Sequence, residues 1–222
     1  MLFMVLDTET TNGQVRDDKL DLSDSLVYDL GYAIVDENGK VYLTRSFVIE
    51  EIFNNETLME VAFFKDKIPQ YKEDIESGKR TLTSFFKARK QLLKDLVDYN
   101  CNIVSAHNSY FDKRALNVTY RYLTKSKYRW FFHYETAIID TLSMARKTIC
   151  KNDDYVKFCI DNDYLTKHKK PRVRATAEIL YRYLTNNTDF IESHTGLEDV
   201  LIEKEILKIC LTMLSLDDII EM

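Results

Sequence analysis

An apolar run, Leu2 to Leu6, is followed without a break by Asp7, and Glu9 stands two positions further on. A run with no polar residue is typical of a central strand that is buried on both faces of a sheet. Because side chains alternate along a strand, Asp7 and Glu9 point to the same side, and both carboxylates can reach one cation. Acidic residues commonly end strands, so this pair alone indicates little. The first constraint is therefore a buried strand that ends in two carboxylates.

The segments that follow have the order of an α/β protein with a mixed sheet. Asn38-Gly39 separates two apolar runs, 26–35 and 41–49, and Asn-Gly between strand patterns is a strong signal for an antiparallel hairpin. An apolar face at helical spacing predicts a helix from Thr81 to about Asn100, and the crossover makes a strand at 102–106 parallel to the first. We also predict short helices and loops at 50–80, a short strand at 138–139, and helices at 111–123, 141–150, 153–162, 175–184 and 196–214.

The composition predicts one domain, 1–222. The chain is 45% hydrophobic and has only five Gly and two Pro, which argues against long linkers. No apolar run approaches a membrane span, and no signal-peptide pattern precedes Asp7, so no membrane partner is expected. The four cysteines include no CxxC pair and are typical of reduced thiols in a cytoplasmic protein.

A net charge of −5 is unusual for a protein that binds phosphates, whose affinity normally comes from Lys and Arg. A site that holds divalent cations needs clustered carboxylates, and a bound cation reverses the local sign of the charge. Net charge therefore does not exclude nucleic acid as a partner.

Asp112 occupies a second position where a strand meets a helix. The segment begins at Ala106, passes through a turn at Asn108, and enters the predicted helix near Phe111. A carboxylate in the first turn of a helix is favoured by the helix dipole. Asp112 is therefore either a helix-stabilising residue or part of a site.

A third acidic position opens the last predicted helix. Thr195–Glu198 fits a capping box, and Asp199 then shares an inward face with Ile202 and Ile206. A carboxylate on a buried face is costly unless it is paired or holds a metal. His194 lies just before this helix, where a single histidine is usually a surface residue, but its nearness to Asp199 favours a role in a site.

Taken together, these residues resemble the three exonuclease motifs of the DnaQ-like, DEDDh 3′→5′ exonucleases. The matching segments are Asp7-x-Glu9, Asn108-x-x-Phe111-Asp112 and His194-x4-Asp199. A sister subclass has Tyr four positions before the last Asp, where this chain has Thr195, so the histidine form is favoured. The resemblance spans nearly the whole chain and implies an RNase H-like fold, with a mixed five-stranded sheet flanked by helices.

Two more segments, 139–142 and 174–184, also look like parts of this family, and the whole chain is similar to small stand-alone members carried by bacteriophages. One departure is Gly196-Leu197-Glu198, where the family often has Ala-Leu and a small residue. The departure does not involve a predicted ligand.

The resemblance implies hydrolysis that depends on two divalent cations. Asp7, Glu9, Asp112 and Asp199 would hold the cations, typically about 3.5–4 Å apart, and His194 would act as the general base. Oxygen-only ligands favour Mg²⁺ or Mn²⁺ over zinc. The implied reaction removes nucleoside 5′-monophosphates from the 3′ end of DNA, and we expect single-stranded DNA.

The predicted substrate contacts are less constrained than the carboxylates. They are Thr8, Thr10, Asn108, Lys169, Lys170 and Arg172. The first three flank the acidic motifs, while the others belong to the basic stretch 167–174; a second stretch, 125–132, mixes cations with aromatic residues. Basic grooves with aromatic side chains hold single strands, although a Lys/Arg run is usually a solvated loop and aromatic residues are usually core. We interpret His107 as structural.

Three alternatives stay open. One is an exoribonuclease that trims RNA 3′ ends, because nothing in the sequence separates DNA from RNA. Another is a non-catalytic module that binds nucleic acid or a polymerase, although such a module would be expected to lack a ligand. The last is that each acid is only a cap or a surface charge. A DNA polymerase is a candidate partner, and the sequence does not indicate an oligomeric state.

Overall fold

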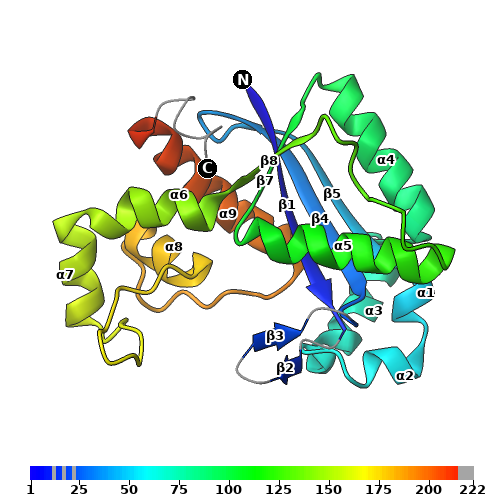
Figure 1. Ribbon diagram of the computed structural model, residues 1–222, viewed down its shortest axis with the longest axis horizontal. Coiled ribbons are helices and arrows are strands. Elements are labelled where there is room, and N and C mark those ends of the chain that lie inside the picture. Colours follow the sequence, from blue (N-terminus) through cyan, green and yellow to red (C-terminus); the bar gives the residue numbers. More distant parts are fainter. Residues whose placement is uncertain (12–13, 17–18, 22–23, 215–222) are drawn as a thin grey trace.

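The computed structural model describes residues 1–11, 14–16, 19–21 and 24–214, and its centre is a mixed sheet of six strands (Figure 1). The strands lie in the order β6-β5-β4-β1-β7-β8. Their bounds are β1 (Leu2–Thr10), β4 (Val27–Asp36), β5 (Val41–Ile49), β6 (Thr81–Thr83), β7 (Ile103–Ala106) and β8 (Ala137–Asp140). Strands β2 (Gln14–Arg16) and β3 (Lys19–Asp21) form a separate antiparallel pair.

The helices lie on both faces of this sheet (Figure 1). They are α1 (Glu50–Phe53), α2 (Glu56–Met59), α3 (Ile68–Glu76), α4 (Phe85–Asp98), α5 (Ser109–Thr124), α6 (Thr141–Lys147), α7 (Asp153–Asp161), α8 (Ala177–Thr185) and α9 (Gly196–Met213), with 3₁₀ turns at Lys65–Lys67 and Ile149–Lys151. None of the helices in the described part of the chain combines the length and the apolar character that crossing a bilayer requires.

The strand directions agree with the sequence prediction. Strand β1 is antiparallel to β4, β4 is antiparallel to β5, and β1 is parallel to β7. The predicted short strand is β8, which lies parallel to β7. The segment 50–80 contains short helices and loops, as expected. The predicted mixed α/β fold of the RNase H type is therefore confirmed.

Two details of that prediction are wrong. The sheet has a sixth strand, because Thr81–Thr83 pairs in parallel with the end of β5 instead of starting the helix. Helix α4 begins only after Ser84, whose side chain accepts a hydrogen bond from the Lys87 amide. Strand β1 also continues to Thr10, since its pairing with β4 extends to Thr10 and Val27. Asp7 and Glu9 therefore lie within the strand and not beyond its end.

Alternation along β1 divides the apolar core into two layers. Met4 and Leu6 pack with α1, α3, α4 and α5 on one face of the sheet. Phe3 and Val5 pack with α6, α7, α8 and α9 on the other. Asp7 continues the series of Phe3 and Val5, so its side chain points toward the layer that contains α9.

Candidate active site

The four predicted metal ligands come from three elements that meet at one end of the sheet. Strand β1 carries Asp7 and Glu9, the first turn of α5 carries Asp112, and the first turn of α9 carries Asp199. A cavity of about 1320 Å³ opens there and is lined by Asp7, Glu9 and Asp199 together with His194. Residues separated by nearly the whole chain thus face one space.

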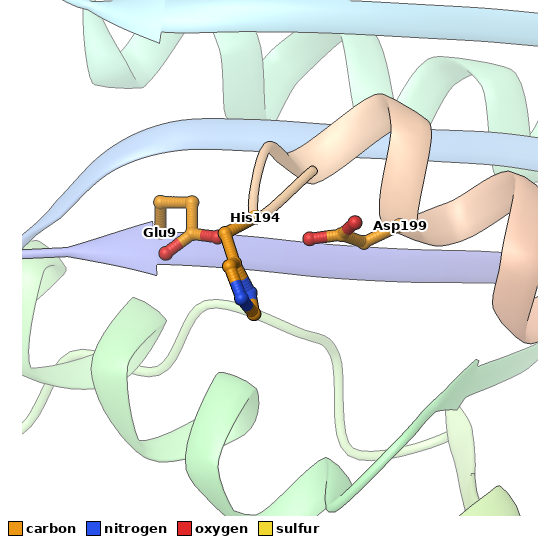
Figure 2. A group of neighbouring side chains, drawn as sticks. All are labelled: Glu9, His194 and Asp199. Atoms are coloured by element: carbon orange, nitrogen blue, oxygen red, sulfur yellow. The ribbon is translucent and has the colours of Figure 1, made fainter. Parts of the chain in front are cut away.

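Glu9, His194 and Asp199 form the centre of this arrangement (Figure 2). One oxygen or nitrogen atom from each of the three side chains lies within 4.8 Å of the other two. Glu9 and Asp199 are buried, while the side chain of His194 is 40% exposed. The geometry therefore combines buried anions with a histidine that solvent can reach.

Close contact between two glycines brings α9 to β1. Gly31 lies opposite Asp7 in the ladder of β1 and β4. A Cβ atom on Gly31 would stand 2.2 Å from the carbonyl carbon of Gly196, and a Cβ on Gly196 would stand 2.8 Å from the Gly31 nitrogen. The start of α9 therefore rests directly on the sheet. Any side chain at Gly196 would therefore collide with the backbone of Gly31.

The predicted capping box at the start of α9 does not form. The hydroxyl of Thr195 donates to Glu198 at 2.8 Å, but Glu198 turns away to bind Arg80 and Lys79. The Thr195 amide donates instead to Asp199 Oδ2 at 2.9 Å. The reason is electrostatic, because a buried guanidinium attracts the Glu198 carboxylate more strongly than a backbone amide does. Asp199 is consequently held by the backbone at the start of its own helix.

Asp112 is fixed by the strand that carries the first acidic pair. Its Oδ1 atom accepts hydrogen bonds from the Thr8 amide at 3.1 Å and from the Thr8 hydroxyl at 2.8 Å. Asn108 precedes α5 in a left-handed conformation, with φ at 74°. The amides of Asn108 and Ser109 donate to Asp140, which tightens the turn. Asp112 is therefore buried beside Thr8 and held rigidly.

The carboxylates carry more negative charge than the surrounding protein balances. Burial, and then repulsion from Glu203 and Asp112, raises the pKa of Asp7 well above its usual value. Burial likewise raises the pKa of Asp112 and of Asp199 to about 7, although hydrogen bonds from Thr8 and Thr195 oppose this. Among the described residues, no hydrogen-bond partner reaches the buried Asp7 Oδ2 atom.

Two further carboxylates, Glu203 and Glu192, escaped the sequence prediction. Glu203 is 3% exposed, and its Oε2 atom accepts a hydrogen bond from the His107 amide at 3.2 Å. Burial raises its pKa, followed by repulsion from Asp112. Its position one helical turn after Asp199 on the same inward face was the signal that could have revealed it. Burial and the Asp199 charge also raise the pKa of Glu192 to about 7.

The segment 50–80 contributes a side chain to the site. The ring of His194 stacks on Phe64, with ring centroids 4.4 Å apart and planes 10° from parallel. His194 itself has a positive φ of 49°, and its Nδ1 atom lies 3.8 Å from Glu192 Oε2. Partial burial, and then the charge of Lys67, lowers the pKa of His194, so its ring is neutral at physiological pH.

Five of the six predicted substrate contacts line the cavity, and one does not. Thr8, Asn108, Lys169, Lys170 and Arg172 line the cavity. Thr10 is buried and does not line it. His107 has both ring nitrogens within hydrogen-bond distance of protein atoms, Thr141 Oγ1 at 3.1 Å and the Ala175 carbonyl at 2.7 Å, as a structural residue would.

These features fit a hard divalent cation. The converging donors from β1, α5 and α9 are carboxylate oxygens, which Mg²⁺ and Mn²⁺ prefer. The buried Asp7 Oδ2 atom without a hydrogen-bond partner and the raised carboxylate pKa values are the features that a cation would relieve.

The fold is similar to that of solved DEDDh exonucleases. The chain is similar to the nuclease domain of 3′hExo, a DEDDh family member solved with rAMP, with a TM-score of 0.59 at 12% identity, over 96% of this chain and 92% of that one. It is also similar to E. coli exonuclease I, solved as a zinc-bound complex with single-stranded DNA, with a TM-score of 0.56 at 14% identity and 96% of this chain covered.

Cell-death related nuclease 4 has a TM-score of 0.52 at 12% identity, again over 96% of this chain. The chain spans 40% of the exonuclease I chain and 64% of the nuclease 4 chain. No protein-family model matches the sequence, and no curated protein matches it. The shared fold is thus visible in three dimensions at identities where sequence comparison finds nothing.

Proposed function

We propose that this protein is a metal-dependent 3′→5′ exonuclease that hydrolyses single-stranded DNA and releases nucleoside 5′-monophosphates. The observation that carries the proposal is the convergence of Asp7, Glu9, Asp199 and His194 on one cavity. Asp112 does not line this cavity, but its charge acts on Asp7, and the chain does not balance the buried negative charge. In this proposal the whole chain serves as one exonuclease domain.

The carboxylates would hold two divalent cations. Asp7, Glu9, Asp112 and Asp199 are the proposed ligands, and Thr8 and the Thr195 amide orient two of them. When bound, such cations stabilise the charge that develops on the attacking and leaving oxygens of an in-line displacement. Mg²⁺ and Mn²⁺ suit these ligands best.

His194 is the proposed general base. Its neutral imidazole would accept a proton from the attacking water, and its partial exposure lets water reach the ring. The Glu192 carboxyl group, 3.8 Å from Nδ1, would stabilise the resulting imidazolium in its ionised form. Stacking on Phe64 would orient the ring between turnovers.

The substrate class follows from the charges around the cavity. Lys169, Lys170 and Arg172 line it and would bind phosphates, while Asn108 lies near the proposed position of the terminal nucleotide. Exonuclease I has been solved with single-stranded DNA, which supports the DNA proposal. The rAMP in the 3′hExo structure keeps RNA as the second candidate substrate.

Purified protein incubated with 5′-labelled oligonucleotides tests the proposal. Single-stranded DNA, duplex DNA and RNA are compared in Mg²⁺, in Mn²⁺ and in EDTA. We expect a ladder that shortens from the 3′ end, nucleoside 5′-monophosphates as product, and no reaction in EDTA. A faster reaction on RNA than on DNA would assign RNA as the substrate. No cleavage of any polymer by a metal-loaded, folded preparation would refute the proposal.

A further inference from the structure

A second large groove, of about 1070 Å³, lies along the outer face of α5, and we call it the α5 groove. We propose that it binds the single-stranded segment upstream of the 3′ end, through its phosphates and through stacking on its bases. We call the cavity lined by Asp7, Glu9 and Asp199 the carboxylate cavity. The proposal rests on the proposed function, because it assigns the path of the polymer that would be hydrolysed in this cavity.

The position of α5 connects the groove to the active site. Asp112 in the first turn of α5 points inward, while Tyr110 in the same turn lines the groove. Further groove residues follow on one face of the helix at helical spacing, through Arg114 and Arg121 to Lys125 just beyond its end. At 1.5 Å per residue, this face extends about 20 Å from the active site, which is enough for several nucleotides.

The charge of the groove complements a phosphate chain. Five cations line it, whereas Asp24 is the acidic residue in its lining. The cations are Lys113, Arg114, Arg121, Lys125 and Lys127. Within the described part of the chain, none of these five forms an ion pair with a carboxylate. In a chain of net charge −5, five cations in one groove without a carboxylate partner among the described residues predict an anionic ligand.

Exposed aromatic rings lie among these cations. Trp130 is 60% exposed, and the Arg121 guanidinium lies over its ring at 4.3 Å. Tyr110 is 65% exposed, and its hydroxyl accepts a hydrogen bond from Arg114 at 2.9 Å. Lys125 lies over Tyr122 at 4.3 Å. Aromatic faces held beside cations are the arrangement with which proteins bind single strands without reading their sequence.

The segment 50–80 also lines the groove, through Leu58 and Val61. The same segment places Phe64 on His194 at the cavity. This segment therefore borders both the site of hydrolysis and the proposed path of the strand. The basic residues Lys169 and Lys170 line the carboxylate cavity and not the α5 groove, so the two sets of cations can be tested separately.

Trp130 provides a direct probe, because it is the single tryptophan of the chain. The measurement adds a trinucleotide or a 20-residue oligothymidylate to the wild-type protein in EDTA, where no hydrolysis occurs. We expect saturable quenching of Trp130 emission by the long oligonucleotide and little change with the trinucleotide. Binding of the long oligonucleotide, seen by anisotropy of a label, without any change in Trp130 emission would overturn the proposal.

A triple variant, Lys113→Ala with Lys125→Ala and Lys127→Ala, tests the charges. Three lost phosphate contacts should weaken binding of the long oligonucleotide about 10- to 100-fold at 0.1 M salt and reduce the slope of log K against log salt by about 2. The matched control, Lys72→Ala with Lys87→Ala and Lys90→Ala, removes three exposed lysines elsewhere and should bind as wild type does.

The two proposals fail in different ways. If the wild type hydrolyses oligonucleotides but the groove variant binds them with wild-type affinity and salt slope, the groove proposal is wrong and the exonuclease proposal stands. If the wild type neither binds nor hydrolyses any oligonucleotide, both are wrong. An equal loss in the control variant would mean that overall charge, and not the groove, determines binding.

Discussion

Two clusters of buried carboxylates in the described part of the chain differ in whether the chain supplies a cation. In the carboxylate cavity, Asp7 and its neighbours face one another without a buried basic residue among the described residues close to them. In the second, which we call the Arg80 cluster, Asp29, Asp74 and Glu198 surround Arg80, a fully buried guanidinium.

The Arg80 cluster contains its own cation, although Asp29 Oδ1 has no hydrogen-bond partner among the described residues and burial raises the pKa of Asp29. Arg80 reaches Asp29 at 3.2 Å, Asp74 at 2.9 Å and Glu198 at 2.7 Å. Asp29 also accepts hydrogen bonds from the Tyr71 hydroxyl at 2.6 Å and the Gly196 amide at 2.9 Å. Burial works against ionisation of Glu198, but its bonds to Lys79, Thr195 and Arg80 together lower its pKa to about 2.

The presence or absence of an internal cation separates structural carboxylates from carboxylates that could bind a metal ion. Glu198 and Asp199 are adjacent in α9, yet the first joins the Arg80 cluster and the second joins the carboxylate cavity. A buried carboxylate with an internal cation destabilises the fold only when that cation is removed, whereas one without a cation destabilises the metal-free fold until a metal ion binds. The following experiments test this distinction.

The largest expected effect is on hydrolysis. Asp112→Asn keeps the shape of the side chain but removes a proposed ligand charge, so hydrolysis should fall to background. Its metal-free unfolding temperature should rise, because one buried like charge disappears. The control Asp98→Asn alters an exposed carboxylate on α4 and should leave nuclease activity unchanged. Wild-type nuclease activity in a highly purified Asp112→Asn preparation would contradict the ligand assignment.

His194→Ala tests the proposed general base, which lies beside the carboxylates of the cavity. Removing a general base should lower the rate of hydrolysis by about 10²–10⁴-fold, while the affinity for divalent cations measured by calorimetry changes little. His133→Ala, at an exposed position, is the matched control. A rate loss below tenfold would assign proton transfer to another group.

Arg80→Met breaks the balanced cluster. Removing one partner of a buried charge network should destabilise the protein by about 3–5 kcal/mol, since Asp29 is left buried and unpaired. The neighbouring Lys79→Met removes a half-exposed cation and should cost less than about 1 kcal/mol in denaturant unfolding. Equal losses from the two variants would show that burial does not distinguish these cations.

Bound divalent cations should balance the negative charge of the carboxylates in the carboxylate cavity. The pKa values of Asp112 and Asp199 are about 7 when folded, whereas unfolded aspartate has a pKa of about 3.9. The folded state therefore binds more protons between these values, and the metal-free protein loses stability as pH rises from about 4 to about 7.

Mg²⁺ or Mn²⁺ binds the ionised carboxylates, so it should raise the unfolding temperature at pH 8 and have little effect at pH 5. At a hundredfold excess over Kd, the expected gain is about 2.7 kcal/mol. Differential scanning calorimetry at the two pH values measures it. The Asp112→Asn variant serves as the control and should gain less at pH 8.

Much of the fold could be predicted from local patterns. The apolar run of β1, the turn at Gly39 and the helical face of α5 follow from periodicity and turn chemistry, which act between neighbouring residues. Thr81–Thr83 was missed because its state depends on pairing with β5, which no local pattern encodes. The predicted capping box at Thr195 does not form for a similar reason, since the Glu198 carboxylate binds Arg80 instead.

The sequence by itself determined which carboxylates could meet, because Asp7, Glu9, Asp112 and Asp199 each hold a definite place on a strand or in the first turn of a helix. Only the tertiary structure decided what surrounds them. It added Glu203 and Phe64 to the site, brought α9 onto the sheet at Gly31 and Gly196, and gave the only fully buried arginine to the Arg80 cluster within the described part of the chain. Burial and charge balance are sums over segments far apart in the chain, so they exist only once the chain has folded.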